Sequence, residues 1–147
     1  MISDTLDFFL TLSRVQATVA RRFDNTLGSL HGLGFGDFAL LLHLSQAPDG
    51  RLRRYELAER VGLTVSAVTR ALIPLEKIGL VTRLPDAEDA RAAYAVITPV
   101  ARQLVDDALY AAERVGEELT APEEPARLAA LTETLSRMGG LRRTSIG

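Results

Sequence analysis

The sequence predicts a mainly α-helical protein in which a helix-turn-helix is followed by a small β-hairpin wing. Two short helical patterns, over 55–61 and 65–78, meet at a Gly-Leu-Thr turn. Two runs of alternating residues, over 80–84 and 93–97, then enclose a charged tip, as the strands of a hairpin do. Long amphipathic patterns at both ends of the chain predict N- and C-terminal helices, which we expect to form a dimerisation lobe.

The composition is that of a globular protein and excludes several kinds of chemistry. The 147 residues are 47% hydrophobic and 24% charged, and they include no cysteine. The lack of cysteine excludes disulfides, thiolate catalysis, cysteine zinc sites and thiol redox sensing. The first residues show no signal-peptide pattern, and no apolar run approaches the ~18 residues that span a bilayer. We therefore expect a cytoplasmic protein.

Charge is unevenly distributed along the chain. The net charge is −2, yet residues 51–91 hold eight basic and six acidic residues. An acidic scaffold that carries a weakly basic nucleic-acid-binding unit fits this distribution. A solvated surface of mixed charge fits it equally well, so charge alone does not decide the function.

The first helix is predicted over residues 3–30, with Ser3 or Asp4 as its cap. Its apolar positions recur every three or four residues and form one stripe. These positions are Leu6, Phe9, Leu10, Val19, Phe23, Leu27 and Leu30. Because little chain precedes this helix, we expect it to lie against a second subunit.

A glycine-rich segment, 32–36, separates the first helix from a second one over 35–46. It does not follow a strand and lacks the GxGxxG spacing, so we interpret it as a helix-to-helix turn rather than a phosphate-binding loop. Gly34 would then be the N-cap, and Asp37 would lie favourably in the first helical turn.

The helix over 65–78, capped by Thr64, is the candidate reader of a DNA groove. Val68, Leu72 and Leu75 form its inner face, whereas Ser66, Thr69, Arg70 and Ile73 fall elsewhere around the helix. Hydroxyl groups can bond to phosphates or bases, and an arginine can bind guanine O6 and N7 with both prongs. The alternative interpretation is an ordinary solvated helix face.

Pro74 conflicts with a regular reader helix. It lacks an N–H group and its ring clashes with the carbonyl of Arg70, at a usual cost of ~3 kcal/mol or more. We therefore predict a kink or break between Arg70 and Pro74, with 65–72 facing DNA and 75–78 forming a supporting turn.

The wing tip, 86–91, carries Arg91 as the candidate for insertion into the minor groove. Asp89 lies two residues away and could hold that arginine in place. The alternative is an exposed ion pair worth less than ~1 kcal/mol.

Two further helices are predicted near the C-terminus. Thr98 and Pro99 begin a helix over 99–119, and Pro125 lies near the start of another that carries a leucine stripe. Packed against their twins, these terminal helices would make a two-fold dimer whose reader helices lie ~34 Å apart and require a palindromic site. A monomer that buries its own helices is the alternative.

An ordered series of short motifs runs through the middle of the chain. The series is Glu56-Leu57-Ala58, Gly62-Leu63-Thr64, Val68-Thr69-Arg70, Leu75-Glu76-Lys77, Gly79-Leu80-Val81, Arg83, Asp89 with Arg91, and Ile97-Thr98. With these motifs, residues 32–104 resemble the multiple antibiotic resistance regulator (MarR) family of winged-helix transcription factors. The flanking helix lengths extend the resemblance to nearly the whole chain.

The resemblance implies a single domain over 1–147, with dimerisation helices at 1–31 and 99–140 and a winged helix-turn-helix at 32–98. It implies a homodimeric regulator, more often a repressor, that binds an operator in double-stranded DNA and in some members responds to a small aromatic or phenolic effector. The residues expected to contact DNA are Arg54, Thr64, Ser66, Thr69, Arg70, Arg83 and Arg91. Pro74, Ala90 and Ala101 depart from the family pattern, and Ala90 replaces a second basic residue of the wing.

Neither an enzyme nor a metal or cofactor site is predicted. His31 and His43 lack metal-ligand spacing, and neither a GxSxG elbow nor a Walker loop occurs. We interpret His43 as a satisfied core or interface residue, and the acidic tip at Asp86, Glu88 and Asp89 as ordinary hairpin solvation. The remaining alternative function is a winged-helix protein–protein module without DNA affinity.

Overall fold

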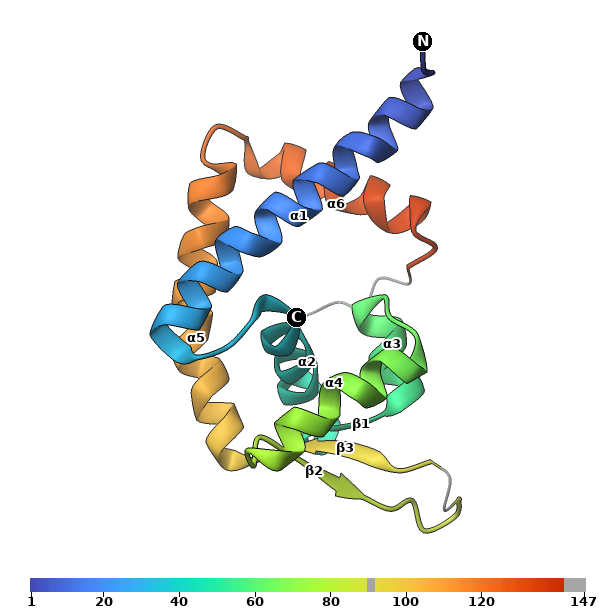
Figure 1. Ribbon diagram of the computed structural model, residues 1–147, viewed down its shortest axis with the longest axis vertical. Helices are drawn as coiled ribbons and strands as arrows, with labels where there is room; N and C mark the ends of the chain where they lie inside the picture. Colours follow the sequence, from blue (N-terminus) through green and yellow to red (C-terminus); the bar gives the residue numbers. More distant parts are fainter. Residues whose placement is uncertain (90–91, 142–147) are drawn as a thin grey trace.

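The computed structural model describes residues 1–89 and 92–141 and has six α-helices and a three-stranded sheet within them (Figure 1). The helices are α1 (Asp4–His31), α2 (Phe35–Gln46), α3 (Arg54–Val61), α4 (Val65–Lys77), α5 (Pro99–Thr120) and α6 (Pro125–Met138). The strands are β1 (Arg51–Arg53), β2 (Val81–Leu84) and β3 (Tyr94–Ile97), and a short 3-10 turn, η1 (Pro48–Gly50), precedes β1. The predicted fold class, a mainly helical winged helix-turn-helix with long terminal helices, is confirmed.

Local sequence chemistry sets most helix ends. Ser3, Thr64 and Thr98 each accept a hydrogen bond from the backbone N–H three residues later, at 3.2, 3.1 and 3.3 Å, and so cap α1, α4 and α5. Gly32 and Gly62 end α1 and α3 in the left-handed conformation, at φ of 67° and 70°, which a residue with a Cβ atom rarely adopts. These ends place the turns where the sequence predicted them.

The N-terminus of α2 is capped by a different helix. Gly34, its N-cap, has no side chain, and Asp24 of α1 accepts the Phe35 N–H at 2.7 Å instead. The segment 32–36 is thus a helix-to-helix turn, as predicted. Nearby, the rings of Phe23 and Phe35 stack with centroids 4.2 Å apart and join α1 to α2.

The sheet contains the two predicted strands of the wing and a third strand, β1, at Leu52 and its arginine neighbours. β3 lies in the middle and pairs antiparallel with β2 on one side and with β1 on the other. Leu52 of β1 lies opposite Ala95, and both are buried. The wing is therefore anchored to the chain segment that leads into α3.

One hydrophobic core joins α2 to α3, α4, the sheet and α5. Its fully buried members include Leu41, Leu44, Leu57, Leu72 and Val105. α1 packs beside α5 through its C-terminal half, where Leu27 is buried. By contrast, α6 and the N-terminal half of α1 extend away from this core (Figure 1) and have no buried residue.

The predicted break at Pro74 is wrong. α4 continues without interruption from Val65 to Lys77, and the Ile78 N–H still bonds to the Pro74 carbonyl at 3.2 Å. Leu72 and Leu75, on either side of the proline, are buried, and each such burial stabilises the helix by roughly 1.5–3 kcal/mol. This packing outweighs the single backbone hydrogen bond that the proline removes. A bend within the continuous helix remains a prediction.

No single helix among the described residues is long and apolar enough to cross a bilayer. α1 and α2 reach that length and hydropathy only as a pair bent by 74°, and α2 is part of the core.

Candidate nucleic-acid interface

α4 has two distinct faces. Val68, Leu72 and Leu75 turn inward and are at most 2% exposed. On the outside, Ser66, Arg70, Ile73 and Lys77 are exposed and recur at spacings of four, three and four residues, which places them in one strip along the helix. We call these four residues the outer strip. Since neither Ser66 nor Arg70 is buried, both are free to approach a ligand at this face.

Thr64, in the turn before α4, caps this helix just ahead of the outer strip. Thr64 Oγ1 accepts the Ala67 N–H at 3.1 Å, so its hydroxyl hydrogen is still free to be donated. Thr64 is exposed and Thr69, on the flank of the strip, is half-buried. The structure thus places Thr64, Ser66, Thr69 and Arg70 on one element, as predicted.

The remaining predicted residues come from neighbouring elements. Arg54 is the first residue of α3, which packs against α4, and is half-buried. Arg83 is exposed on β2, where it lies opposite Ala95 of β3. Arg91 and Ala90 lie outside the described residues.

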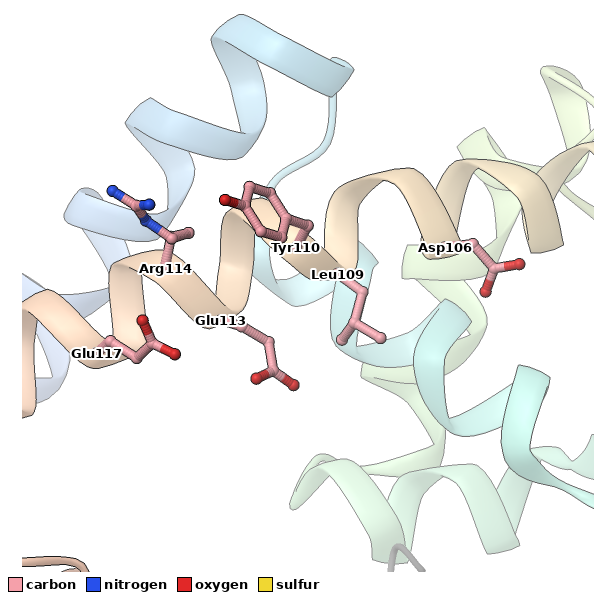
Figure 2. Close-up of a pocket in the computed structure, with 6 residues that line it drawn as sticks. All are labelled: Asp106, Leu109, Tyr110, Glu113, Arg114 and Glu117. Carbon is pink, nitrogen blue, oxygen red and sulfur yellow. The ribbon is translucent and has the colours of Figure 1, made fainter.

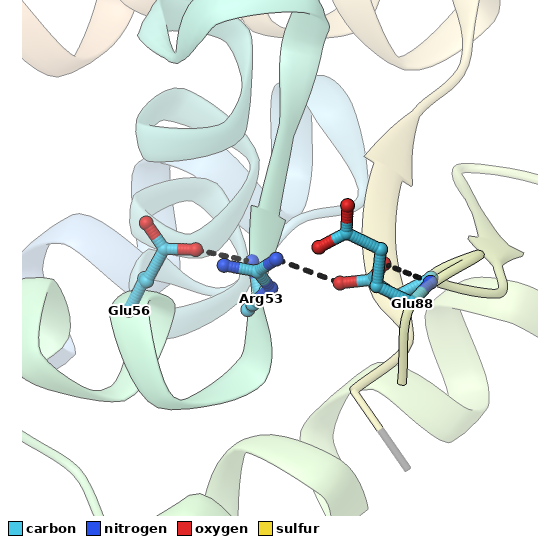
Figure 3. Close-up of polar contacts among 4 residues, drawn as sticks. Arg53, Glu56 and Glu88 are labelled. Carbon is cyan, nitrogen blue, oxygen red and sulfur yellow. Dashed lines mark hydrogen bonds and ion pairs between the residues drawn. The ribbon is translucent and has the colours of Figure 1, made fainter. Parts of the chain in front are cut away.

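Sequence reasoning missed the polar contacts that hold the wing. Arg53 Nη2 donates to Asp86 Oδ2 at 2.6 Å, and Arg53 N donates to Glu56 Oε1 at 3.1 Å (Figure 3). The Glu88 N–H also binds Asp86, at 3.0 Å. The acidic tip is therefore not simply solvated at Asp86, whose side chain is only 10% exposed. The Glu88 N–H and then the Arg53 guanidinium lower the pKa of the Asp86 carboxyl.

An aromatic ring completes this anchor. The guanidinium carbons of Arg51 and Arg53 lie 4.6 and 5.0 Å from the ring centroid of Tyr94, within cation–π range. Tyr94 faces Arg53 directly in the β1–β3 pairing. In the sequence, Arg51 and Arg53 flank the apolar residue Leu52. Because alternate residues of a strand share one face, this pattern could have indicated that both arginines lie on the same face of the sheet.

The side chain of His43 lacks a hydrogen-bond partner that the sequence interpretation expected it to have. It is half-buried on α2, and within the described part of the chain its buried Nδ1 atom has no hydrogen-bond partner. Burial, and then the positive charge of Arg60, lower the pKa of this imidazole. The pKa of Asp37, in the first turn of α2, is raised instead, by burial and then by the nearby negative charge of Asp24.

A shallow hollow of about 360 Å³ lies along α5, away from α4 (Figure 2). All its lining residues belong to that helix: Asp106, Leu109, Tyr110, Glu113, Arg114 and Glu117. Three carboxylates against one guanidinium make it unsuitable for DNA phosphates. Among the described residues, no three His, Asp or Glu side chains gather as a metal site would require.

The comparisons with known proteins agree with this geometry. The model of the MarR family matches residues 36–93. BldR, a transcriptional regulator from Sulfolobus solfataricus, is 31% identical over 91% of this chain and 96% of its own, with a TM-score of 0.79. The chain belongs to the MarR family. It is therefore a MarR-family transcriptional regulator with a winged-helix fold.

Two solved structures that are less similar in sequence share the MarR fold. Sco3205, a MarR family regulator from Streptomyces coelicolor in complex with DNA, is 21% identical, with 99% of this chain and 96% of that chain covered and a TM-score of 0.85. CouR from Rhodococcus jostii RHA1, bound to p-coumaroyl-CoA, is 21% identical, with 95% and 96% covered and a TM-score of 0.81. No curated protein has a significantly similar sequence.

Proposed function

We propose that this regulator binds a palindromic operator as a homodimer and represses transcription from it. The observation that carries the proposal is the outer strip of α4, where Ser66 and Arg70 are exposed above a buried apolar face. A capped helix with this arrangement fits the major groove, where side chains reach the base edges. The DNA complex of Sco3205 supports the same use of the fold.

A homodimer is supported by the apolar side chains that the terminal helices leave uncovered. Many large apolar side chains exposed on the same helices usually mark an interface. The exposed set comprises Leu6, Phe8, Phe9, Leu10 and Val15 of α1, and Leu131, Leu135 and Met138 of α6. A second copy presents the same faces, so a two-fold arrangement covers both sets at once. Reader helices ~34 Å apart would then meet successive major grooves.

The proposed contacts are made to base edges, to phosphates and to the minor groove. Arg70 and Thr69 on α4 read base edges, whereas Thr64 and Ser66 donate hydroxyl hydrogens to phosphates or bases. Arg54 and Arg83 neutralise phosphates on either side of the reader helix. Arg91 enters the minor groove from the wing.

The experiment is a selection of bound fragments from the source genome, followed by binding measurements on the enriched duplex and on a scrambled one. Arg70→Ala should reduce discrimination between the two duplexes by ~1–3 kcal/mol, because a bidentate base contact is lost. Arg54→Ala, the matched control, should weaken binding to both duplexes by a similar factor. Equal losses on both duplexes for Arg70→Ala would contradict the readout assignment.

Salt dependence separates this proposal from a winged-helix protein–protein module. Binding through several phosphates releases counterions and weakens steeply between low and moderate salt. No enrichment of any fragment, together with no salt-dependent binding to random duplex DNA, would favour the protein–protein module.

We also propose that a small aromatic effector releases the DNA. Phe23, Phe35 and Phe38 form a stacked series at the α1–α2 junction, with Phe23 and Phe35 half-buried. Such rings suit an aromatic ligand, and CouR was solved with p-coumaroyl-CoA. A thermal-shift series with benzoate, salicylate and p-coumarate should show a stabilising compound that also lowers affinity for the enriched duplex. A series without such a compound would argue against effector control.

A further inference from the structure

The start of α5 lies beside the end of α4 (Figure 1) and is hydrogen-bonded to two junctions of residues 32–98, which we call the winged-helix lobe. Thr98, the N-cap of α5, donates its hydroxyl hydrogen to the Gly79 carbonyl at 2.8 Å, in the turn between α4 and β2. One helical turn later, Arg102 Nη1 donates to the Ser45 carbonyl at 3.2 Å, in the last turn of α2. The start of α5 therefore holds both the end of the reader helix and the end of α2.

The Arg102 guanidinium lies against the glycine that leads into β1. Gly50 is buried and has a φ of 65°, a conformation that glycine adopts without strain. A Cβ atom at this position would overlap the guanidinium and would lie 2.9 Å from Ile97 Cγ2. The site also suits a cation, because the last carbonyls of a helix lack backbone partners and carry partial negative charge. Arg102 is thus packed on the turn between α2 and β1, although the residue as a whole is exposed.

These two hydrogen bonds orient α5 more strictly than its apolar packing does. Near its start, α5 buries Ala101 and Val105 in the core, and apolar burial is non-directional. Hydrogen bonds, by contrast, weaken steeply when their geometry is bent. Farther along, α5 packs beside α1, where Glu118 pairs with Arg22. Because the exposed apolar face of α1 belongs to the proposed dimer interface, α5 connects that interface to the winged-helix lobe.

We propose that Arg102, together with Thr98, sets the separation of the two half-sites that the dimer accepts. This inference rests on the proposed binding of a palindromic operator by a homodimer. Arg102 is a positioning residue, because it acts through the end of α2 and the turn into β1 and not through a contact with DNA. Without its hydrogen bond, the winged-helix lobe keeps the Thr98 contact and pivots about it. The two reader helices then meet a wider range of half-site separations, each with lower avidity.

The test measures how affinity depends on the spacing of the half-sites. The probe is a duplex that the full-length wild-type protein enriches from a random-sequence library, remade with base pairs added to or removed from its centre. Each added base pair turns one half-site by about 35° around the duplex. The wild type should therefore lose about tenfold in affinity for each base pair, because simultaneous binding of both half-sites is impaired. A duplex with one half-site scrambled measures binding by one subunit alone.

Arg102→Ala should flatten this dependence on spacing. It should bind the original duplex about fivefold more weakly, lose less than about threefold for each base pair, and bind the single half-site as the wild type does. Arg102→Lys keeps a donor for the Ser45 carbonyl and should fall between the two. Arg114→Ala is the matched control, because it removes an exposed arginine of the same helix away from both junctions, and it should keep the wild-type spacing profile. Circular dichroism and light scattering confirm that the variants remain folded dimers.

The outcomes distinguish this inference from the proposal beneath it. If no duplex with two half-sites is enriched, palindromic binding itself fails and the role of Arg102 fails with it. If such a duplex is enriched but Arg102→Ala keeps the wild-type profile, or the wild type is indifferent to spacing, only the inference about Arg102 is overturned. Equal losses on the single and paired half-sites, together with a shallower salt dependence, would show that Arg102 binds a phosphate directly and would overturn the positioning role.

Discussion

Arg53 Nη2 donates a hydrogen bond to Asp86 Oδ2 across 2.6 Å, and this contact ties the strand before α3 to the segment that follows β2. The two side chains are 32% and 10% exposed, so water screens the pair only partly. The Tyr94 ring, in cation–π contact with Arg53, stiffens the same corner. The direction in which the wing leaves the core is therefore set by β1 as well as by the hairpin itself.

Breaking this anchor should weaken DNA binding without changing its specificity. Asp86→Ala and Arg53→Ala each release the wing, so affinity should fall by a similar factor on the enriched duplex and on random DNA, measured by fluorescence anisotropy. Because both variants remove the same contact, the double variant should lose less than the two losses combined. Glu88→Ala is the control for removing one negative charge, since Glu88 lies exposed at the same tip. Additive losses would show that the pair does not act as a unit.

The cap of the reader helix offers a second prediction. Thr64→Ala removes the acceptor for the Ala67 N–H and should lower the free energy of unfolding by ~1 kcal/mol. Thr64→Ser keeps the hydroxyl and should retain most of this stability. Urea denaturation measures both variants, and fraying of the first turn of α4 should also weaken binding to the enriched duplex. A Thr64→Ala protein as stable as the wild type would contradict the role of the cap.

Contacts between residues close in the chain could be predicted from the sequence, whereas contacts between distant residues could not. The caps at Ser3, Thr64 and Thr98 each act three residues away, and their residue types alone indicate them. Arg53 and Asp86 are 33 residues apart, and only the pairing of both β1 and β2 with β3 brings their segments together. At Pro74 the local rule that proline breaks a helix gave the wrong prediction, because the burial of Leu72 and Leu75 outweighs the cost of the proline.

Dimer formation through α6 gives a third prediction. Leu131→Asp places a charge in the exposed apolar stripe of α6 and should yield a protein of one-chain mass by size-exclusion chromatography with light scattering. Ala129→Asp introduces the same charge on an exposed residue outside that stripe and should leave the dimer intact. The Leu131→Asp monomer should also bind the palindromic duplex far more weakly, because two linked half-sites bind more tightly than one. A wild-type protein of one-chain mass would overturn the dimer itself.

His43 should make stability depend on pH near neutrality. The folded pKa of its imidazole lies below the ordinary value of 6.5, because burial and Arg60 disfavour the charged form. Between those two pKa values the unfolded chain binds more protons, so the free energy of unfolding rises with pH across this window and falls as the solution is acidified through it. His43→Leu and His43→Gln both remove this titration and should flatten the dependence measured by urea denaturation from pH 5 to 7.5. His43→Leu also removes the unpaired Nδ1, so at pH 7.5 it should be at least as stable as the wild type. Variants that keep the wild-type slope would show that another group is responsible for it.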